Sequence, residues 1–195
     1  GAINYLMATR SPGSTLKPFI YAKAIQRNLI AKNEVFQDSP VQVAGYAPGN
    51  FDFTFSGQVN LEEALVRSLN IPAIKTLELL SPELFESELR TFLGSRLKNT
   101  KRSGLSLAVG GLYMSAEDLA ELYLEFANPG EAGRLTFTEA SVKKGSGFLF
   151  EKSSSQVIQD LLIQYDGTGR KSAFKTGTSH DRQDAWTIQL TKDHL

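Results

Sequence analysis

Cysteine is absent from the 195 residues, and histidine occurs only twice, at His180 and His194. The chain therefore has no disulfide, no cysteine nucleophile and no thiolate ligand for a metal. Two histidines are too few for a histidine-rich metal cage, so we predict neither a metal nor a cofactor. The lack of cysteine fits the periplasm and many other compartments, and it does not distinguish between them.

An excess of charge of either sign is also missing, because Lys plus Arg and Asp plus Glu each number 21. No block of like charge forms a binding tail, so we expect no nucleic-acid partner. No apolar run approaches the roughly 20 residues that span a bilayer, and no signal peptide is visible. Membrane attachment is therefore expected only through segments absent from this chain. Residues 1–195 are 41% hydrophobic, which is enough for the core of a single domain.

Start and stop signals divide most of the chain into helices. Residues 14–30 have a helical apolar pattern, in which Pro18 is tolerated because it lies in the opening turn. A second helix is expected at 60–70, and Pro72 is expected to keep Ile71 out of a helix. Further helices are expected at 73–80, 82–93, 115–128 and 153–164.

Strand signals are clear only near the end of the chain. Residues 172–179 and 184–191 predict two strands that are joined by a polar turn. Residues 33–60 are rich in glycine, proline and aromatic rings, and they indicate an ordered extended segment. Three phenylalanines in that segment alternate like the core face of a strand: Phe51, Phe53 and Phe55. The fold class expected from these patterns is α/β (α+β), with helices dominant.

Within the first expected helix, the segment RSPGSTLKPF places Ser14 three positions before Lys17. Positions i and i+3 of a helix share a face, so the Lys17 amine can lie over the Ser14 hydroxyl. A serine is a poor nucleophile until a base takes its proton, and a lysine serves if its pKa falls from about 10.4 toward neutrality. Burial and a second cation can lower the pKa of a lysine in this way. Taken alone the spacing is weak evidence, because many such pairs lie on solvated surfaces.

Two later motifs strengthen this interpretation. Ser68-Leu69-Asn70 supplies a second hydroxyl and an amide, and Lys175-Thr176-Gly177-Thr178 supplies a cation, two hydroxyls and a glycine on an expected strand. S-x-x-K with S-D-N and K-T-G is the signature of class A β-lactamases and penicillin-binding proteins, and S-L-N is the looser S-x-N form. Ser179-His180-Asp181 imitates a catalytic triad, but adjacent residues cannot face one another, and we interpret it as a hairpin turn.

The motifs and the segments around them resemble the transpeptidase domain of class A penicillin-binding proteins, with the 1C-type branch the most similar. The resemblance extends from about residue 10 to residue 190. It implies a penicillin-binding-protein/β-lactamase-like transpeptidase fold. It also implies a peptidoglycan D,D-transpeptidase that transfers D-Ala-D-Ala stem peptides by serine acylation and that β-lactams such as penicillin acylate. The segments that carry it beyond the three motifs are GYAPGNFDFTFSGQVNLEEALVRSLNIPA, GLSLAVGGLYMSAEDLAELY and FKTGTSHDRQDAW.

By this resemblance, Ser14 is the acylated nucleophile and Lys17 is the base that activates it. Ser68 and Asn70 would relay protons and hold the amide on the acyl side of the substrate. Lys175 would keep Lys17 deprotonated and would attract a substrate carboxylate. All five are therefore candidate catalytic residues.

The same resemblance makes the strand after Lys175 the substrate-binding strand. Thr176 and Thr178 would bind the substrate carboxylate, and Gly177 would leave room for the substrate to lie along the strand. The backbone N–H groups of Ser14 and Thr178 would form the oxyanion hole.

Compared with the family pattern, the chain is short at both ends. We expect residues 1–195 to be a single, truncated transpeptidase domain, without the outer strands, the last helix and the glycosyltransferase domain. The exposed sheet edge along AWTIQLT would be a pairing hazard. We expect it to be covered by the N-terminal AINYLMAT, by a partner chain in a dimer, or by a partly disordered region. The full-length protein is expected in the periplasm, anchored to the inner membrane.

Two alternative functions stay open at this point. In a β-lactamase or a D,D-carboxypeptidase, water would resolve the acyl-enzyme, although the sequence shows no carboxylate placed to activate that water. A catalytically inert module would bind wall peptide without turnover; the intact motifs argue against it and the missing strands argue for it.

Overall fold

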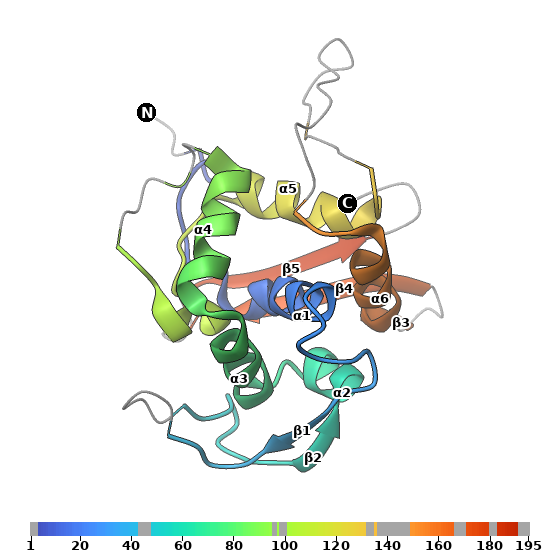
Figure 1. The fold of residues 1–195 in the computed structure, drawn as a ribbon. Helices are drawn as coiled ribbons and strands as arrows, with labels where there is room; N and C mark the ends of the chain where they lie inside the picture. The colour runs from blue at the N-terminus through green and yellow to red at the C-terminus, as the bar shows by residue number, and fades with distance from the viewer. Residues whose placement is uncertain are drawn as a thin grey trace.

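The structure is a computed structural model that describes residues 4–42, 48–94, 97, 101–131, 135, 149–165, 171–179 and 183–190 (Figure 1). Its elements in chain order are η1 (Gly13–Leu16), α1 (Lys17–Gln26), β1 (Val35–Asp38), β2 (Gly57–Asn60), α2 (Leu61–Val66), α3 (Asn70–Leu80), α4 (Pro82–Leu93), η3 (Gly104–Val109), α5 (Ala116–Ala127), α6 (Lys152–Leu162), β3 (Ile163–Tyr165), β4 (Lys171–Thr178) and β5 (Ala185–Leu190).

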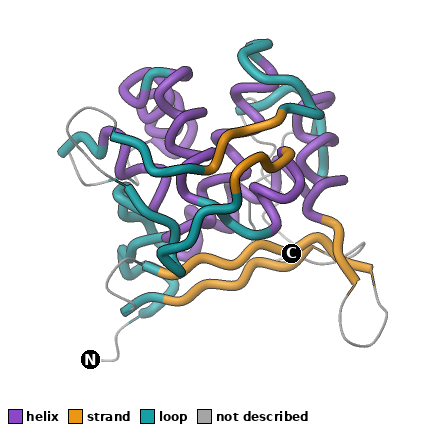
Figure 2. Tube along the Cα trace, turned by 90° about the horizontal axis from the view of Figure 1, so that it is seen from below, coloured by secondary structure: helices purple, strands orange, loops and turns teal. Residues whose placement is uncertain are grey.

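The strands form two separate antiparallel sheets. One has the order β3-β4-β5, and the other is the hairpin β1-β2. Figure 2 shows the helices on one face of the β4-β5 pair, with the β1-β2 pair some way off. On β5 the residues that face the helices are half-buried or buried, namely Trp186, Ile188 and Leu190, and the residues between them are exposed. This alternation is expected of a sheet that is covered on one side.

Helix α1 lies at the centre of the molecule, and its residues from Lys17 to Ala24 are all buried. A helix that is apolar on most of its surface is packed on all sides, and this one contacts α3, α6 and η1. Phe19 is the centre of an aromatic cluster, with its ring 4.9 Å from that of Tyr123 and 4.7 Å from that of Phe126. These rings hold α1 against α5, so the residues at the start of α1 have little freedom to move.

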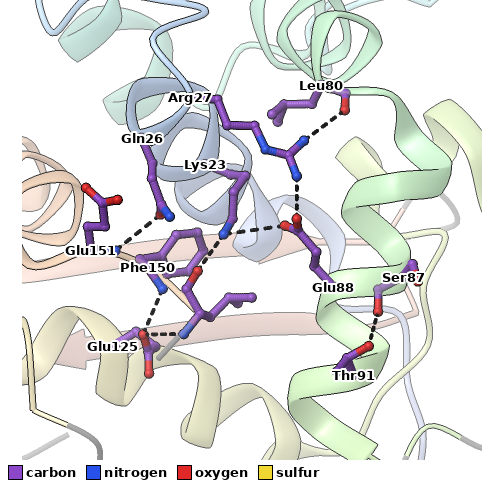
Figure 3. A network of polar contacts seen from close by, with 11 residues as sticks. Lys23, Gln26, Arg27, Leu80, Ser87, Glu88, Thr91, Glu125, Phe150 and Glu151 are labelled. Carbon is purple, nitrogen blue, oxygen red and sulfur yellow. Dashed lines mark hydrogen bonds and ion pairs between the residues drawn. The ribbon is translucent and has the colours of Figure 1, made fainter. Parts of the chain in front are cut away.

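The end of α1 is fixed by a network of polar contacts (Figure 3). The buried Lys23 Nζ donates to Leu149 O at 2.5 Å and lies 3.4 Å from Glu88 Oε2 on α4. Arg27 also pairs with Glu88. Glu125 on α5 accepts the N–H groups of Leu149 and Phe150 at 3.0 and 3.2 Å. The network connects α1, α4, α5 and the segment that leads into α6. Most of its donors and acceptors are buried, so they need these partners in place of water.

Several element boundaries differ from those predicted. Residues 14–30 do not form one helix: a 3₁₀ turn precedes α1, which ends at Gln26. The expectation that Pro72 excludes Ile71 from a helix is wrong, because α3 begins at Asn70. Pro72 lies in the first turn of α3, where a missing N–H removes no helical bond.

Other differences concern strands. Hairpin β1-β2 was expected only as extended chain, and the expected helix 153–164 ends at Leu162, where β3 begins. The prediction that three alternating phenylalanines form a core face is wrong, because their exposed fractions are 60%, 85% and 40% for Phe51, Phe53 and Phe55. The expected helices at 82–93 and 115–128 and both C-terminal strands are confirmed to within a few residues.

Within the described residues, β5 is the edge of its sheet and no strand pairs with its outer side. The N-terminal segment does not extend this sheet: Arg10 bridges to Met114, and Leu6 O accepts the N–H of Glu117. Of the three covers that we expected for this edge, residues 2–9, a partner chain or a partly disordered region, the first is not seen as strand pairing for residues 4–9. In the same described part, no helix is both long and apolar enough to cross a bilayer.

Candidate active site

Ser14 lies in the 3₁₀ turn η1, in direct contact with the strand β4. The residue before it, Gly13, has a φ of 55°, in the region that glycine enters most easily. A Cβ atom added to Gly13 would lie 2.5 Å from Thr178 O and 2.8 Å from Thr178 N. The missing side chain thus lets the turn that carries Ser14 sit against the peptide groups of Thr178.

Hydrogen bonds from distant elements hold this turn in place. Trp186 Nε1 on β5 donates to Ser11 O at 2.8 Å, and Tyr123 Oη on α5 donates to Thr15 O at 2.7 Å. Ser11 Oγ donates to Gly110 O at 2.9 Å. The backbone on both sides of Ser14 is therefore held by hydrogen bonds to β5, to α5 and to Gly110. A preorganised nucleophile needs such a fixed backbone.

Gly177 has a structural role in addition to the predicted one of leaving room for substrate. A Cβ atom added there would lie 2.6 Å from both Pro12 O and Thr15 Cγ2. The space that the glycine leaves is taken by the η1 turn of the chain itself. Gly177 also lines the cleft, but its lack of a side chain is required by the packing of η1 on β4.

Lys17, the first residue of α1, is completely buried. Its Nζ donates to Ser68 O and to Asn70 Oδ1, each at 2.6 Å. Burial, followed by the nearby charge of Lys175, lowers the pKa of Lys17 well below its usual range. Within the described residues no hydrogen bond joins Lys17 Nζ to Ser14.

Lys175 is 3% exposed and occupies the centre of β4. Its Nζ donates to Ser68 Oγ and to Thr176 O, each at 2.8 Å. Burial lowers the pKa of Lys175 to about 8. The two lysines therefore lie on opposite sides of Ser68, with one bonded to its carbonyl oxygen and the other to its hydroxyl.

Ser68 and Asn70 connect α2 to α3. Ser68 has a φ of 58°, an unusual value for a residue with a side chain, and it ends the helical path that began at Asn60. Asn60 caps α2 through a capping box with Glu63. Because the chain turns sharply at Ser68, its hydroxyl points to Lys175 while its carbonyl oxygen points to Lys17.

These groups surround a cleft of about 520 Å³. Ser14, Ser68 and Asn70 line it on the helical side, and Thr176, Gly177 and Thr178 line it on the side of β4. Lys17 and Lys175 lie behind this lining and are connected to it through Ser68 and Asn70. The structure thus brings together all eight residues that the sequence singled out.

The side of β4 that faces away from β5 is only partly paired. Ser179 N–H donates to Asp184 O, so alternate residues of β4 direct their peptide groups toward β5. The peptide groups of Thr176 and Thr178 then point the other way, where, among the residues that the structure describes, β3 pairs only with residues 171–173. An extended peptide in the cleft can therefore add to this edge.

The sequence did not reveal two residues that support the site, Asp38 and Asn50. Asn50 Oδ1 accepts the backbone N–H of Asn70 at 2.8 Å, and Asn50 Nδ2 donates to both oxygens of Asp38 at 2.9 Å. The only signal for Asn50 was its place in the segment that carried the family resemblance. Arg67 and two of the exposed phenylalanines, Phe51 and Phe53, also line the cleft without having been predicted there.

No metal centre is formed by the part of the chain that the structure describes, since it holds no cluster of three His, Asp or Glu side chains suited to an ion. His180 and Asp181, which we assigned to a hairpin turn, lie outside the described residues, as does His194. The chemistry available in the cleft is that of hydroxyls, two buried amines, amides, backbone N–H groups and the guanidinium of Arg67.

Residues 2–189 match the family described as the penicillin binding protein transpeptidase domain. The chain is 37% identical to penicillin-binding protein 1C of Escherichia coli (strain K12), covering 100% of this chain and 26% of that protein. It is 28% identical to penicillin-binding protein 1A of Neisseria meningitidis serogroup A, covering 96% of this chain and 27% of that protein. The chain spans about a quarter of the length of these curated relatives.

Among solved structures, the penicillin-binding protein PonA1 from Mycobacterium tuberculosis superimposes with a TM-score of 0.78 at 18% sequence identity. The match covers 98% of this chain and 60% of that one. The structure of PonA1 in complex with penicillin V matches with a TM-score of 0.77. At this level of identity the likeness concerns the fold alone, and it confirms the predicted helix-rich α/β fold.

Proposed function

This chain belongs to the penicillin-binding protein transpeptidase domain family, and we propose that it is a serine D,D-transpeptidase acting on D-Ala-D-Ala stem peptides of peptidoglycan. The observation that carries the proposal is the position of Lys17. It is a fully buried amine beside the serine turn, and two oxygen atoms accept its hydrogens.

Lys17 acts as the base in its neutral form. A neutral amine has two N–H groups and one lone pair, and Ser68 O and Asn70 Oδ1 take up the two N–H groups. The lone pair is left to accept the proton of Ser14, while burial and Lys175 hold the pKa of Lys17 down. A positioned general base of this kind contributes about 10²–10⁴ to the rate.

The acyl donor binds as an added strand along the free edge of β4. Its terminal carboxylate accepts hydrogen bonds from Thr176 and Thr178 and lies near the charge of Lys175. The scissile carbonyl oxygen points to the N–H groups of Ser14 and Thr178, which the close packing of Gly13 on Thr178 brings together. One donor of an oxyanion hole is worth about 10²–10³ in kcat.

In the acylation step, Ser14 Oγ forms a bond to the carbonyl carbon and its proton passes to Lys17. The peptide C–N bond then breaks, and the leaving D-Ala nitrogen takes the hydroxyl proton of Ser68, which Lys175 replaces. The amine of a neighbouring stem peptide attacks the ester and passes a proton through Ser68 back to Lys175, and Ser14 Oγ leaves with the proton that Lys17 holds. A β-lactam acylates Ser14 in the same way. Its leaving nitrogen stays attached to the acyl group because it was part of the opened ring, and the ester to Ser14 persists.

A fluorescent penicillin tests this proposal. We expect the wild-type protein to be labelled on Ser14, with the mass increase located on the peptide that contains residues 10–19, and Ser14→Ala to remain unlabelled. Rapid loss of the label would favour the hydrolytic alternative, a β-lactamase or carboxypeptidase. Absence of any Ser14-dependent label would favour a module that binds wall peptide without turnover.

The same proposal includes the cellular location of the domain and its pairing with a second copy. We place the domain in the periplasm, attached to the inner membrane through other parts of a longer protein. We also retain the outer edge of β5 as a surface through which two copies could pair, because an unpaired edge favours strand addition. A mass measurement in solution on wild type and on Thr187→Pro, in the middle of that edge, tests the pairing.

A further inference from the structure

An unbroken chain of hydrogen bonds leads from the hairpin β1-β2 to the amine of Lys17. It starts at Asp38, the last residue of β1, whose two oxygens each accept from Asn50 Nδ2 at 2.9 Å. Asn50 Oδ1 accepts the backbone N–H of Asn70 at 2.8 Å. Asn70 Oδ1 in turn accepts from Lys17 Nζ at 2.6 Å.

The orientation of the Asn50 amide is fixed from both of its ends. An ionised Asp38 only accepts hydrogen bonds, so it must face the NH₂ side of the amide. The backbone N–H of Asn70 only donates, so it must face the carbonyl side. Asn50 Nδ2 also donates to Thr54 O at 2.9 Å, which opposes rotation of the amide further.

The Asn70 amide is held in the same manner. Its Nδ2 donates to Gly49 O at 2.7 Å, so its oxygen is the atom that faces Lys17. Gly49 and Asn50 are consecutive, and together they hold Asn70 by its side chain and by its backbone. This loop therefore sets both the position of Asn70 and the direction of its carbonyl oxygen.

Asp38 supplies the charge that makes this arrangement strong. It is completely buried and Asn50 is 4% exposed. Among the described residues no Lys or Arg forms an ion pair with Asp38, and its oxygens accept from Asn50 Nδ2 and Ser56 N–H, the latter at 2.9 Å. A buried carboxylate that binds only N–H groups orients them more firmly than a neutral acceptor would.

We propose that Asp38 and Asn50 are positioning residues of the active site, which fix Asn70 so that its carbonyl oxygen holds one hydrogen of Lys17 and leaves the lone pair for Ser14. The proposal rests on the proposed function of the site. Neither residue touches the reacting atoms in this scheme, and each acts through Asn70.

A charge swap between positions 38 and 50 tests the proposal. In Asp38→Asn one acceptor oxygen is replaced by an NH₂ group that opposes Asn50 Nδ2, and the charge is lost, so the Asn50 amide is held less firmly against Asn70. In Asn50→Asp two carboxylates oppose each other. We expect each single variant to be acylated by penicillin about 10- to 100-fold more slowly at saturation, since a displaced catalytic group costs about 10²-fold. The dissociation constant of the initial complex should change little.

The double variant Asp38→Asn/Asn50→Asp restores a donor opposite an acceptor. Its amide at position 38 donates to the carboxylate at position 50, which accepts the Asn70 N–H as before, while the second oxygen of that carboxylate faces Thr54 O. We expect it to recover part of the lost rate. The proposal is overturned if both single variants are acylated at the wild-type rate, or if the double variant is as slow as the slower single variant.

Asp118→Asn is the matched control, because Asp118 is another buried carboxylate, in the capping box of α5. We expect it to lower the melting temperature without changing the acylation rate of the folded protein. If a charge variant fails to fold, Asn50→Ala decides the question, since it removes the acceptor without adding charge. Wild-type acylation by folded Asn50→Ala contradicts the proposal.

Hydrogen exchange separates this proposal from the proposed function. We expect the Asn70 N–H to exchange faster in both single variants and to regain protection in the double variant. This result is independent of acylation. A wild-type protein that is never labelled by penicillin overturns the proposed function, whereas unchanged exchange at Asn70 overturns the positioning role.

Discussion

Lys17 Nζ donates to Asn70 Oδ1 over 2.6 Å, although 53 residues separate the two along the chain. The contact joins the first residue of α1 to the first residue of α3, so two helix starts meet behind the cleft. A lysine on an exposed helix would be surrounded by water and would stay charged. Here the surrounding oxygens are few and fixed, which allows the amine to be neutral and correctly oriented.

The first prediction concerns this amine directly. Lys17→Ala should lower the rate constant of acylation by penicillin by about 10²–10⁴, because the general base is lost. The rate is measured by stopping the labelling reaction with fluorescent penicillin at a series of times. Lys32→Ala, at an exposed position, should be acylated like the wild type. Acylation of Lys17→Ala at the wild-type rate would assign the base to another group.

The second prediction concerns stability as a function of pH. Burial lowers the pKa of Lys17 well below 10.5, so between these two pKa values the unfolded chain binds one proton more than the folded protein. The free energy of unfolding therefore rises with pH in that window, by about 1.4 kcal/mol per unit for one full proton. This stabilisation is fully present above the pKa of 10.5 that Lys17 has in the unfolded chain. It is lost as the pH falls through the pKa of Lys17 in the folded protein.

Urea denaturation of the wild type and of Lys17→Met at a series of pH values measures this effect. Methionine fills a similar volume and binds no proton, so the variant should show a flatter dependence in the pH range below the unfolded value of 10.5. Lys175 is present in both proteins, and its contribution cancels to first order. Parallel curves would show that Lys17 is as basic in the folded protein as in the unfolded chain.

The third prediction concerns Gly177. Gly177→Ala would place a methyl group 2.6 Å from Pro12 O, and the η1 turn must move to accept it. Overpacking of this kind costs about 1–3 kcal/mol. Acylation should fall as well, because the displaced turn carries Ser14.

Gly104→Ala provides the comparison for this loss. Gly104 has a φ of 55° and open space around its Cβ position, so alanine there strains the backbone without a collision. We expect it to lower the melting temperature and to leave the acylation rate of the folded protein unchanged. Equal losses of acylation in the two variants would indicate that Gly177 acts only through global stability.

The fourth prediction separates the backbone of Ser68 from its hydroxyl. The φ of 58° favours glycine, so Ser68→Gly should be more stable than Ser68→Ala by about 1 kcal/mol. Both variants lose the hydroxyl that Lys175 holds, and both should be acylated slowly. Thermal melts measure the first effect and penicillin labelling the second. A variant Ser68→Gly that is less stable than Ser68→Ala would contradict the strain at this position.

The sequence alone singled out the eight residues that the structure brings together at the cleft, because three short motifs carry them and each motif can be recognised without knowledge of the fold. It also located most helices, since capping residues such as Asn60 and Ser115 act within one turn. It placed Pro72 wrongly, because a proline that ends one helix and a proline in the first turn of the next have the same local pattern. The sharp turn at Ser68 ends the first helix before Pro72, so Pro72 falls in the first turn of α3.

The support from Asp38 and Asn50 could not be predicted in the same way. Asp38 is 12 residues from Asn50, and Asn50 is 20 residues from Asn70, and the contacts exist only after the hairpin has packed against α3. The exposed phenylalanines were misjudged for a related reason. Alternation along a chain implies a strand face only where a neighbouring strand exists, and none pairs with residues 51–55 in the described part of the chain.

The position of the hairpin β1-β2, away from the β3-β4-β5 sheet, has a consequence for the lifetime of the active state (Figure 1). Proteins open locally in cooperative units whose opening free energies range from about zero up to that of global unfolding. A short two-stranded hairpin belongs to the weaker units. Each opening of the hairpin would release Asn70 while Ser14 stays packed on β4, so the base would be lost while the nucleophile remained in place. We therefore expect the duration of an uninterrupted reactive state to follow the opening rate of this hairpin, whatever the stability of the three-stranded sheet.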